Sequence, residues 1–127
     1  MATRIISTKG APIAVGPYSQ AVEAGGFVFC SGQIPIDPKD GAMVSDDIQS
    51  ATERVIQNLR AVLAGAGVDL ASVVKTTVYL SDMDDFAGMN EVFEKYFGEA
   101  PPTRVCVEVS RLPKGALVEI EAIARIS

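Results

Sequence analysis

The sequence of 127 residues contains no histidine, so it lacks the side chain that most often serves as general base and as metal ligand. Its two cysteines, Cys30 and Cys106, form no C-x-x-C pair, which argues against zinc-ribbon and thioredoxin-type sites. We expect both to be free thiols. Any catalysis must then use arginine, lysine, carboxyl, hydroxyl or thiol side chains, or backbone amides, and we expect no metal.

Long apolar runs and clusters of basic residues are also missing. No apolar stretch approaches the roughly 18 to 20 residues that a transmembrane helix needs. The first residues read as a strand and lack the apolar core of a signal peptide. We therefore expect no membrane partner and a cytoplasmic location. The formal net charge is −5 and the 11 basic residues are scattered, which argues against a nucleic-acid partner.

Residue patterning predicts a single α+β domain that spans residues 1–127. Apolar and polar residues alternate in short runs near the N-terminus, in residues 73–80 and near the C-terminus, which predicts strands. Two longer segments carry apolar residues at helical spacing. The order strand, hairpin, helix, strand, helix, strand, strand favours a mixed sheet of about six strands with both helices on one face.

Capping residues and glycines mark the ends of the two expected helices. Ser45 or Asp46 is the expected N-cap of the first helix, and Gly65 and Gly67 are expected to end it. Ser81 and Asp82 are expected to start the second helix and Gly98 to end it, and aspartates in the first turn complement the helix dipole.

The last two expected strands carry unlike residues at alternate positions. In the first of them the valines are expected to face the core, whereas Arg104, Cys106 and Glu108 face the other way. In the second, Glu119 and Glu121 also point away from the core. We therefore predict that an arginine, a thiol and several carboxylates share one sheet surface.

This mixed surface indicates both chemistry and assembly. A guanidinium grips a planar carboxylate through two parallel hydrogen bonds, and a carboxylate can exchange protons with water. The surface is too apolar for a solvated face and too polar for a core. We therefore expect an oligomer with its site at or near the subunit interface.

Residue chemistry leaves several alternatives open. Arg104 could form a structural ion pair with one of the carboxylates. Cys106 fits a small buried hydrophobe better than a nucleophile, because no histidine is available to activate it. Tyr18 fits interface packing as well as a binding site. Spacing alone does not choose between Glu119 and Glu121.

Six segments together resemble the RidA (YjgF) family of reactive-intermediate deaminases. They cover nearly the whole chain in the order and spacing of that family: Gly16-Pro17-Tyr18-Ser19-Gln20, Ser31-Gly32-Gln33-Ile34-Pro35, Val74-Lys75-Thr76-Thr77-Val78-Tyr79-Leu80, Pro102-Thr103-Arg104-Val105-Cys106-Val107-Glu108-Val109, Arg111-Leu112-Pro113-Lys114 and Val118-Glu119-Ile120-Glu121-Ala122-Ile123-Ala124.

The resemblance implies a homotrimer of chorismate-mutase-like subunits with clefts between neighbours. It also implies hydrolysis of reactive 2-imino acids, such as 2-iminopropanoate and 2-iminobutanoate, to 2-keto acids and ammonia. These imines are by-products of pyridoxal-phosphate dehydratases. The resemblance implies no metal and no organic cofactor.

The resemblance further implies roles for individual residues. Arg104 would bind the substrate carboxylate, Glu119 would position or activate the attacking water, and Tyr18 would close the pocket. The polar lining would be completed by Ser31, Gly32 and the backbone amide of Cys106. Two alternatives remain at this point: a non-catalytic trimeric binder of small carboxylates, which would use the same arginine, and a translation-inhibiting endoribonuclease, which family members have been described as.

Overall fold

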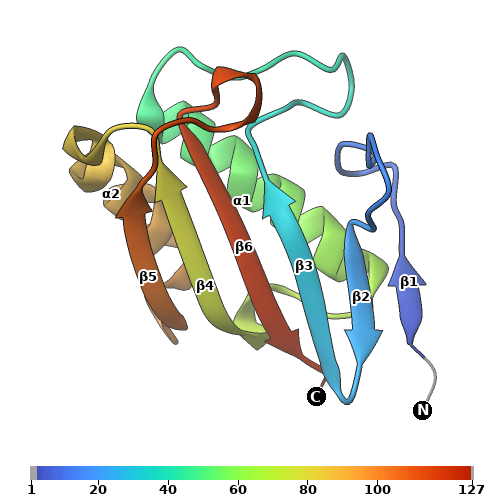
Figure 1. Ribbon diagram of the computed structural model, residues 1–127. Coiled ribbons are helices and arrows are strands. Elements are labelled where there is room, and N and C mark those ends of the chain that lie inside the picture. Colours follow the sequence, from blue (N-terminus) through green and yellow to red (C-terminus); the bar gives the residue numbers. More distant parts are fainter. Residues whose placement is uncertain (1–2, 127) are drawn as a thin grey trace.

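One six-stranded sheet dominates this computed structural model, which describes residues 3–126 (Figure 1). In chain order, the strands are β1 (Arg4–Ile6), β2 (Ala21–Ala24), β3 (Phe27–Gln33), β4 (Val73–Leu80), β5 (Thr103–Glu108) and β6 (Val118–Arg125). The helices are α1 (Ile48–Gly65) and α2 (Phe86–Phe97), and three short 3₁₀ turns are η1 (Leu70–Ser72), η2 (Met83–Asp85) and η3 (Pro113–Gly115). The expected order of elements is confirmed.

The strands lie in the order β1-β2-β3-β6-β4-β5 across the sheet. Neighbours are antiparallel except β4 and β5, which are parallel. β6 therefore lies in mid-sheet, and β5 lies at the edge. The last two strands of the chain are therefore not neighbours, because β4 lies between them. The mixed sheet of six strands is as expected.

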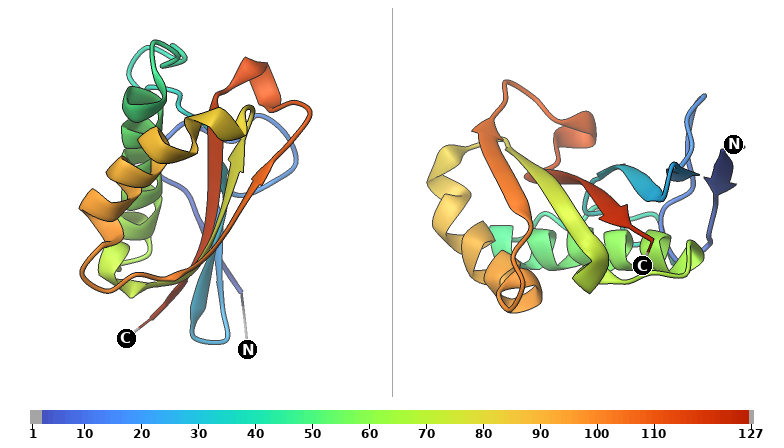
Figure 2. Two further views of the ribbon diagram at one scale, coloured as in Figure 1. Left: turned by 90° about the vertical axis from the view of Figure 1, so that its left-hand side faces the viewer. Right: turned by 90° about the horizontal axis from the view of Figure 1, so that it is seen from below.

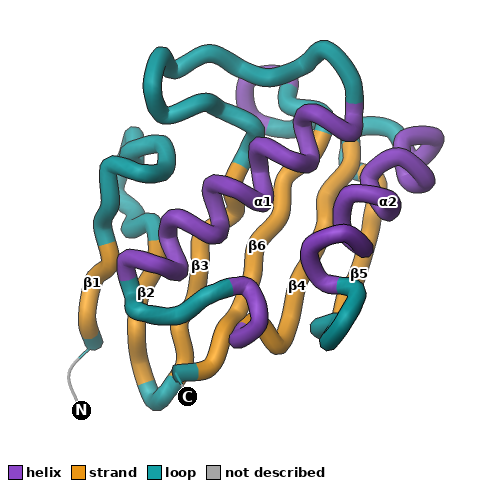
Figure 3. Tube along the Cα trace, turned by 180° about the vertical axis from the view of Figure 1, so that it is seen from behind, coloured by secondary structure: helices purple, strands orange, loops and turns teal. Residues whose placement is uncertain are grey.

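Both helices cover the same face of the sheet, and the other face carries no helix (Figure 2, left; Figure 3). The strand alternation explains this two-layer arrangement. In β6, Val118 and Ile120 are fully buried beneath the helices, whereas Glu119 and Glu121 lie on the uncovered face. We call this uncovered surface the open face. Within residues 3–126, neither helix is long and apolar enough to cross a membrane.

The helices pack on the sheet through the stripes that the sequence predicts. The buried residues of α1 include Val55, Leu59 and Val62, and Met89 and Phe93 are buried in α2. Burial of such side chains contributes about 1.5–3 kcal/mol each to folding. The core therefore lies between the helices and one face of the sheet.

The expected starts of both helices were wrong by a few residues. The N-cap of α1 is Asp47, whose carboxylate accepts a hydrogen bond from the Ser50 amide at 2.7 Å, and neither Ser45 nor Asp46 takes this role. Asp82 caps the turn η2, and α2 begins only after it. Adjacent capping residues compete for one helix end, so the choice depends on the path of the loop.

The hairpin that joins β2 and β3 leads directly to the candidate site. Gly25 and Gly26 have φ of 59° and 85°, the left-handed conformation that this turn requires and glycine tolerates. β3 continues through Cys30 to Gln33. Its pairing with β6 shifts between these two residues, and such an irregularity turns side chains in a new direction.

Candidate functional site

A cavity of about 850 Å³ opens beside the far end of β3. Its walls come from the loop after β1, the loop after β3, and the turn η3 before β6. Four of the predicted site residues line it: Tyr18, Ser31, Gly32 and Glu119. The fold therefore brings these four together, although they come from three separate segments of the chain.

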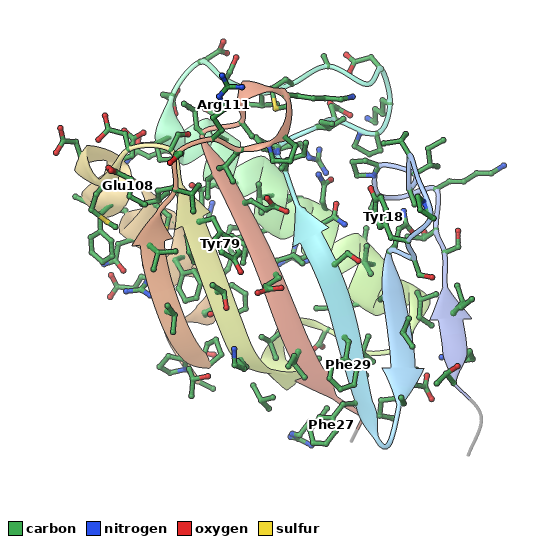
Figure 4. All side chains as sticks on the ribbon, viewed as in Figure 1. Tyr18, Phe27, Phe29, Tyr79, Glu108 and Arg111 are labelled. Carbon is green, nitrogen blue, oxygen red and sulfur yellow. The ribbon has the colours of Figure 1, made fainter. Side chains whose placement is uncertain are left out.

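Ser31 connects the sheet to the loop that carries Tyr18. Its hydroxyl donates to the Ser19 carbonyl at 2.6 Å, and its amide donates to the Gln20 carbonyl at 2.9 Å. The Ser31 hydroxyl hydrogen is thus already engaged, so the oxygen can meet a ligand only as an acceptor. Tyr18 itself is half exposed at the cavity, above β2 in Figure 4.

Glu119 lies against Gly32, and the missing side chain of the glycine makes room for its carboxyl group. A Cβ atom built on Gly32 would overlap Oε2 of Glu119 and would lie 2.9 Å from its Cδ. Burial raises the pKa of the Glu119 carboxyl, and the nearby charge of Glu121 raises it further. A carboxyl group with a raised pKa at a cavity wall is suited to exchange protons with a ligand.

Glu121 occupies the same open face but makes a different contact. The Tyr79 hydroxyl donates to its Oε2 at 2.7 Å, and this bond is the main cause of the raised pKa of Tyr79. The partner of Glu121 is therefore a tyrosine and not a basic side chain. Glu121 does not line the cavity, so the geometry favours Glu119 as the carboxyl that meets a ligand.

Arg104 lies on the helix-covered face and not on the open face. In the parallel pairing its partner on β4 is Thr76, which is buried beneath the helices. Its Nη1 donates to Oδ1 of Asn90 at 2.7 Å. Its guanidinium carbon lies 4.8 Å and 5.4 Å from the ring centroids of Phe93 and Phe86. Such cation–π contacts stabilise a guanidinium in a fixed position.

The predicted shared surface of Arg104 and Glu119 is therefore wrong within one subunit. The valines of β5 face outward, as Val105 shows with 53% exposure, and Arg104, Cys106 and Glu108 face the helix side. The reason is that α2 offers two aromatic rings and an amide to the arginine. Arg104 instead lines a second cavity of about 470 Å³, together with Asn90 and Phe93.

The contacts of Arg104 argue against a structural ion pair and leave its role as an anion-binding residue open. Among the ion pairs found within residues 3–126, none involves Arg104, so the structural ion pair with a carboxylate is not formed. Its guanidinium keeps donors for a further acceptor, because Asn90 engages one nitrogen. Arg104 is thus held in place but remains able to bind an anion.

The two cysteines behave as small apolar residues. Cys30 is buried in the core, and burial raises the pKa of its thiol to about 12. Cys106 is half-buried against the core, and burial raises the pKa of its thiol although Arg104 lowers it. A raised pKa disfavours the thiolate, so neither residue has the properties of a nucleophile. Both are free thiols, as expected.

Sequence reasoning missed the residues that hold the site in place. Asn90 and the ring of Phe93 fix Arg104. The feature of the sequence that could have indicated them is a polar residue, Asn90, beside the apolar stripe of the second helix. Gln20 and Asn58 are buried amides that contact the cavity loops. No group of three or more metal-ligating side chains occurs within the described part of the chain.

The profile of the endoribonuclease L-PSP family matches residues 8–126, and with it nearly all of the chain. The chain belongs to this family. It is the same group as the RidA (YjgF) family that the sequence motifs resemble.

Individual relatives match over nearly their whole length. A RutC family protein of Pyrococcus abyssi is 58% identical over 124 residues, which are 98% of each chain. The 2-iminobutanoate/2-iminopropanoate deaminase of Salmonella typhimurium is 46% identical over 96% of this chain and 97% of its own. The crystal structure of E. coli TdcF with bound serine superimposes with a TM-score of 0.93 at 44% identity, covering 98% and 99% of the two chains.

Proposed function

We propose that the protein is a deaminase that hydrolyses 2-imino acids to 2-keto acids and ammonia. The observation that carries this proposal is the Glu119 carboxyl, partly buried at the cavity wall against Gly32, with a pKa raised by burial. A carboxyl group in such a place can accept a proton from water and return it to a ligand. Both transfers are needed when water replaces an imine nitrogen.

The reaction requires only water and one residue that exchanges protons. The substrate is R–C(=NH₂⁺)–COO⁻, and its C2 is electrophilic because the nitrogen is protonated. As water attacks C2, the Glu119 carboxylate takes one proton and a neutral carbinolamine forms. The Glu119 carboxyl then protonates the amino group, the C–N bond breaks with its electron pair going to nitrogen, and ammonia leaves. As the C=O bond forms, the hydroxyl proton passes to the regenerated Glu119 carboxylate and from it to the ammonia, so ammonium and the 2-keto acid leave and Glu119 is again a carboxylate.

We propose that the substrate carboxylate binds Arg104 of a neighbouring subunit in a homotrimer. Arg104 and Glu119 lie on opposite faces of one subunit, so a single copy does not place both against one small ligand. The open face supports such an assembly, because Phe27 and Phe29 (Figure 4) are 42% and 45% exposed on it, and Val105 is 53% exposed. Apolar side chains gathered on one face are typical of protein interfaces.

The relatives support the same chemistry. The Salmonella protein is named for two short 2-imino acids, and the TdcF structure holds serine, whose carboxylate, nitrogen and short side chain have the shape of such a substrate. The family description also names an endoribonuclease. Against that activity, the cavity lining has only Lys9 and Lys114 as cations, and the net charge is −5, which favours a small anion over a polyanion.

A coupled assay tests the proposed activity. Purified protein is added to a serine or threonine dehydratase reaction, and release of the 2-keto acid is followed. We expect faster release with the wild-type protein and little acceleration with Glu119→Gln. A wild-type protein that binds an unreactive 2-keto acid without accelerating release would instead be a carboxylate-binding protein.

Mixed assemblies test the shared site. Arg104→Ala and Glu119→Gln subunits are each expected to be inactive, and are unfolded and refolded together. If each site takes one residue from each of two neighbours, random trimers restore about one site in four. Activity near one quarter of wild type, with light scattering of a trimer, is the expected result. No recovery in a mixture that forms trimers would contradict a site shared between subunits.

A further inference from the structure

Two loops that belong to no helix or strand form much of the cavity wall. Residues 8–12 contribute Lys9, Ala11 and Pro12, and residues 34–38 contribute Ile34, Ile36 and Pro38. Loops of this kind have few backbone partners of their own, so their interior carbonyl and amide groups need partners from the rest of the protein. In both loops a buried side-chain amide provides them.

Gln20 holds the first loop at both of its ends. Its side chain is buried, with 3% exposure, directly before β2. Its Oε1 accepts from the Thr8 amide at 2.7 Å, and its Nε2 donates to the Thr8 and Pro12 carbonyls at 3.1 Å and 2.8 Å. A fourth, longer contact reaches the Ala11 carbonyl at 3.4 Å. The backbone carbonyl of Gln20 also accepts from Ser31, which connects this loop to the candidate site.

Asn58 holds the second loop from the helix layer. It is fully buried in α1, among the apolar residues that pack on the sheet. Its Nδ2 donates to the carbonyls of Ile34 and Ile36 at 3.2 Å and 2.9 Å, and its Oδ1 accepts from Arg54 Nε at 3.2 Å. Every polar atom of this side chain therefore has a partner.

A buried amide in a helix stripe calls for an explanation beyond packing. An apolar residue of the same size would fill the space without the cost of burying a polar group. It would, however, remove the hydrogen bonds that tie the Ile34 and Ile36 carbonyls to α1, and the loop would lose its fixed position. The side-chain amides of Gln20 and Asn58 therefore hold the loops of the cavity wall, and they contribute little to the packing of the core.

We propose that Gln20 and Asn58 are positioning residues of the deaminase, each holding one wall of the cavity at the distance the substrate needs. This inference rests on the proposed function. The two residues are expected to affect different kinetic constants. The side-chain amide of Gln20 holds residues 8–12, and its backbone carbonyl accepts from Ser31 in the candidate site, so loss of the amide shifts Gln20 and with it Ser31. Asn58 holds the apolar wall of Ile34 and Ile36, which contacts the substrate equally before and during reaction.

Steady-state kinetics of two variants and one control test this division. Gln20→Met is expected to lower kcat about tenfold with little change in KM, because misplacement at the reacting centre weakens transition-state contacts. Asn58→Ala is expected to raise KM about fivefold with little change in kcat, because it removes uniform binding. The control is Val28→Ala, which opens a buried space at the opposite end of β3 from the cavity.

Hydrogen exchange provides a second measurement on the same proteins. The Thr8 amide, which donates to Gln20, should exchange faster in Gln20→Met, and the Ile36 amide should exchange faster in Asn58→Ala. Neither amide should change in Val28→Ala. If all three variants lose activity in proportion to their lost stability, the two amides are only structural and the inference is wrong.

The outcome also separates this inference from the proposed function. A wild-type protein that does not hydrolyse imines overturns the proposed function, and binding of 2-oxobutanoate then replaces kinetics as the readout. Asn58→Ala should weaken that binding about fivefold, and Val28→Ala should not change it. Equal binding by all variants, or no binding by the wild-type protein, would overturn the inference as well.

Discussion

The contact between Gly32 and Glu119 gives a direct way to move the proposed catalytic group. In Gly32→Ala, the new Cβ would overlap Oε2 of Glu119 and would lie 2.9 Å from Cδ and 3.0 Å from Cγ. These atoms belong to the far part of a flexible side chain, so the carboxyl group moves and the strand stays. The φ of Gly32 is outside the left-handed region, so alanine fits the backbone.

The size of the effect follows from this geometry. Ordinary carbon–carbon contact is about 3.5–4.0 Å, so the carboxyl group must retreat by about 1 Å. A misplacement of this size can lower the rate about a hundredfold, which corresponds to about 2.7 kcal/mol of lost transition-state stabilisation. Stability should change little, because replacing glycine by alanine in a compatible conformation typically contributes about 0.4–1 kcal/mol. We therefore expect a stable variant with low activity.

A double-mutant cycle identifies the cause of that loss. The kcat/KM for imine hydrolysis is measured for the wild type, Gly32→Ala, Glu119→Ala and the double variant. If the methyl group acts through Glu119, it has no further effect once Glu119 is truncated. Wild-type activity in Gly32→Ala, or the same additional loss in the Glu119→Ala background, would refute the reasoning. The second result would mean that the methyl group blocks the substrate itself.

Four further predictions concern the arginine, the thiol and the two carboxyl groups. Arg104→Ala should lower kcat/KM at least about tenfold, and Arg104→Lys should recover little, because an ammonium lacks the planar fork; full activity of the lysine variant in the imine assay would show that charge alone suffices. Cys106→Ser should keep most of the activity, because burial raises the pKa of the thiol, and complete loss in a correctly assembled variant would restore a covalent mechanism. The pKa of Glu119 is higher in the folded protein than in the unfolded chain, so its contribution to stability is intact below the pKa of the unfolded chain and is lost as pH rises through the pKa of the folded protein. Replacing the carboxyl group by a neutral amide in Glu119→Gln should therefore raise Tm at neutral pH but not at pH 3. Glu121→Gln keeps an acceptor for Tyr79 and should leave kcat nearly unchanged, and an equal loss of kcat in both glutamine variants would reverse the assignment of the proton-exchanging residue.

Local patterning was enough to predict the elements and their layers. The periods of two and 3.6 are properties of neighbouring residues, so the strands, the hairpin at Gly25-Gly26 and both helices could be found in the sequence. The neighbours of each strand could not be, because pairing depends on the path of the whole chain. β5 and β6 follow each other along the chain, whereas β4 lies between them in the sheet.

The face of β5 was predicted wrongly for a physical reason. The rule that valines face the core assumes that the helix layer is the only apolar surface available. Arginine can lie on the helix side because its long apolar stem packs there and its planar head stacks on aromatic rings. Phe86 and Phe93 supply those rings, and Asn90 supplies the acceptor. None of these tertiary contacts is encoded in the alternation of β5 itself.

The positions of Arg104 and Val105 bear on the proposed assembly. A shift of one residue in the β4–β5 register would exchange the two faces of β5, placing its valines under the helices and its arginine in solvent. For an isolated subunit that exchange would gain about 1.5–3 kcal/mol for each valine buried. The observed register forgoes this gain and leaves Val105 more than half exposed. A neighbouring subunit that covers the open face removes the discrepancy, because it buries the valines where they are and still leaves Arg104 at the sheet edge to bind a carboxylate.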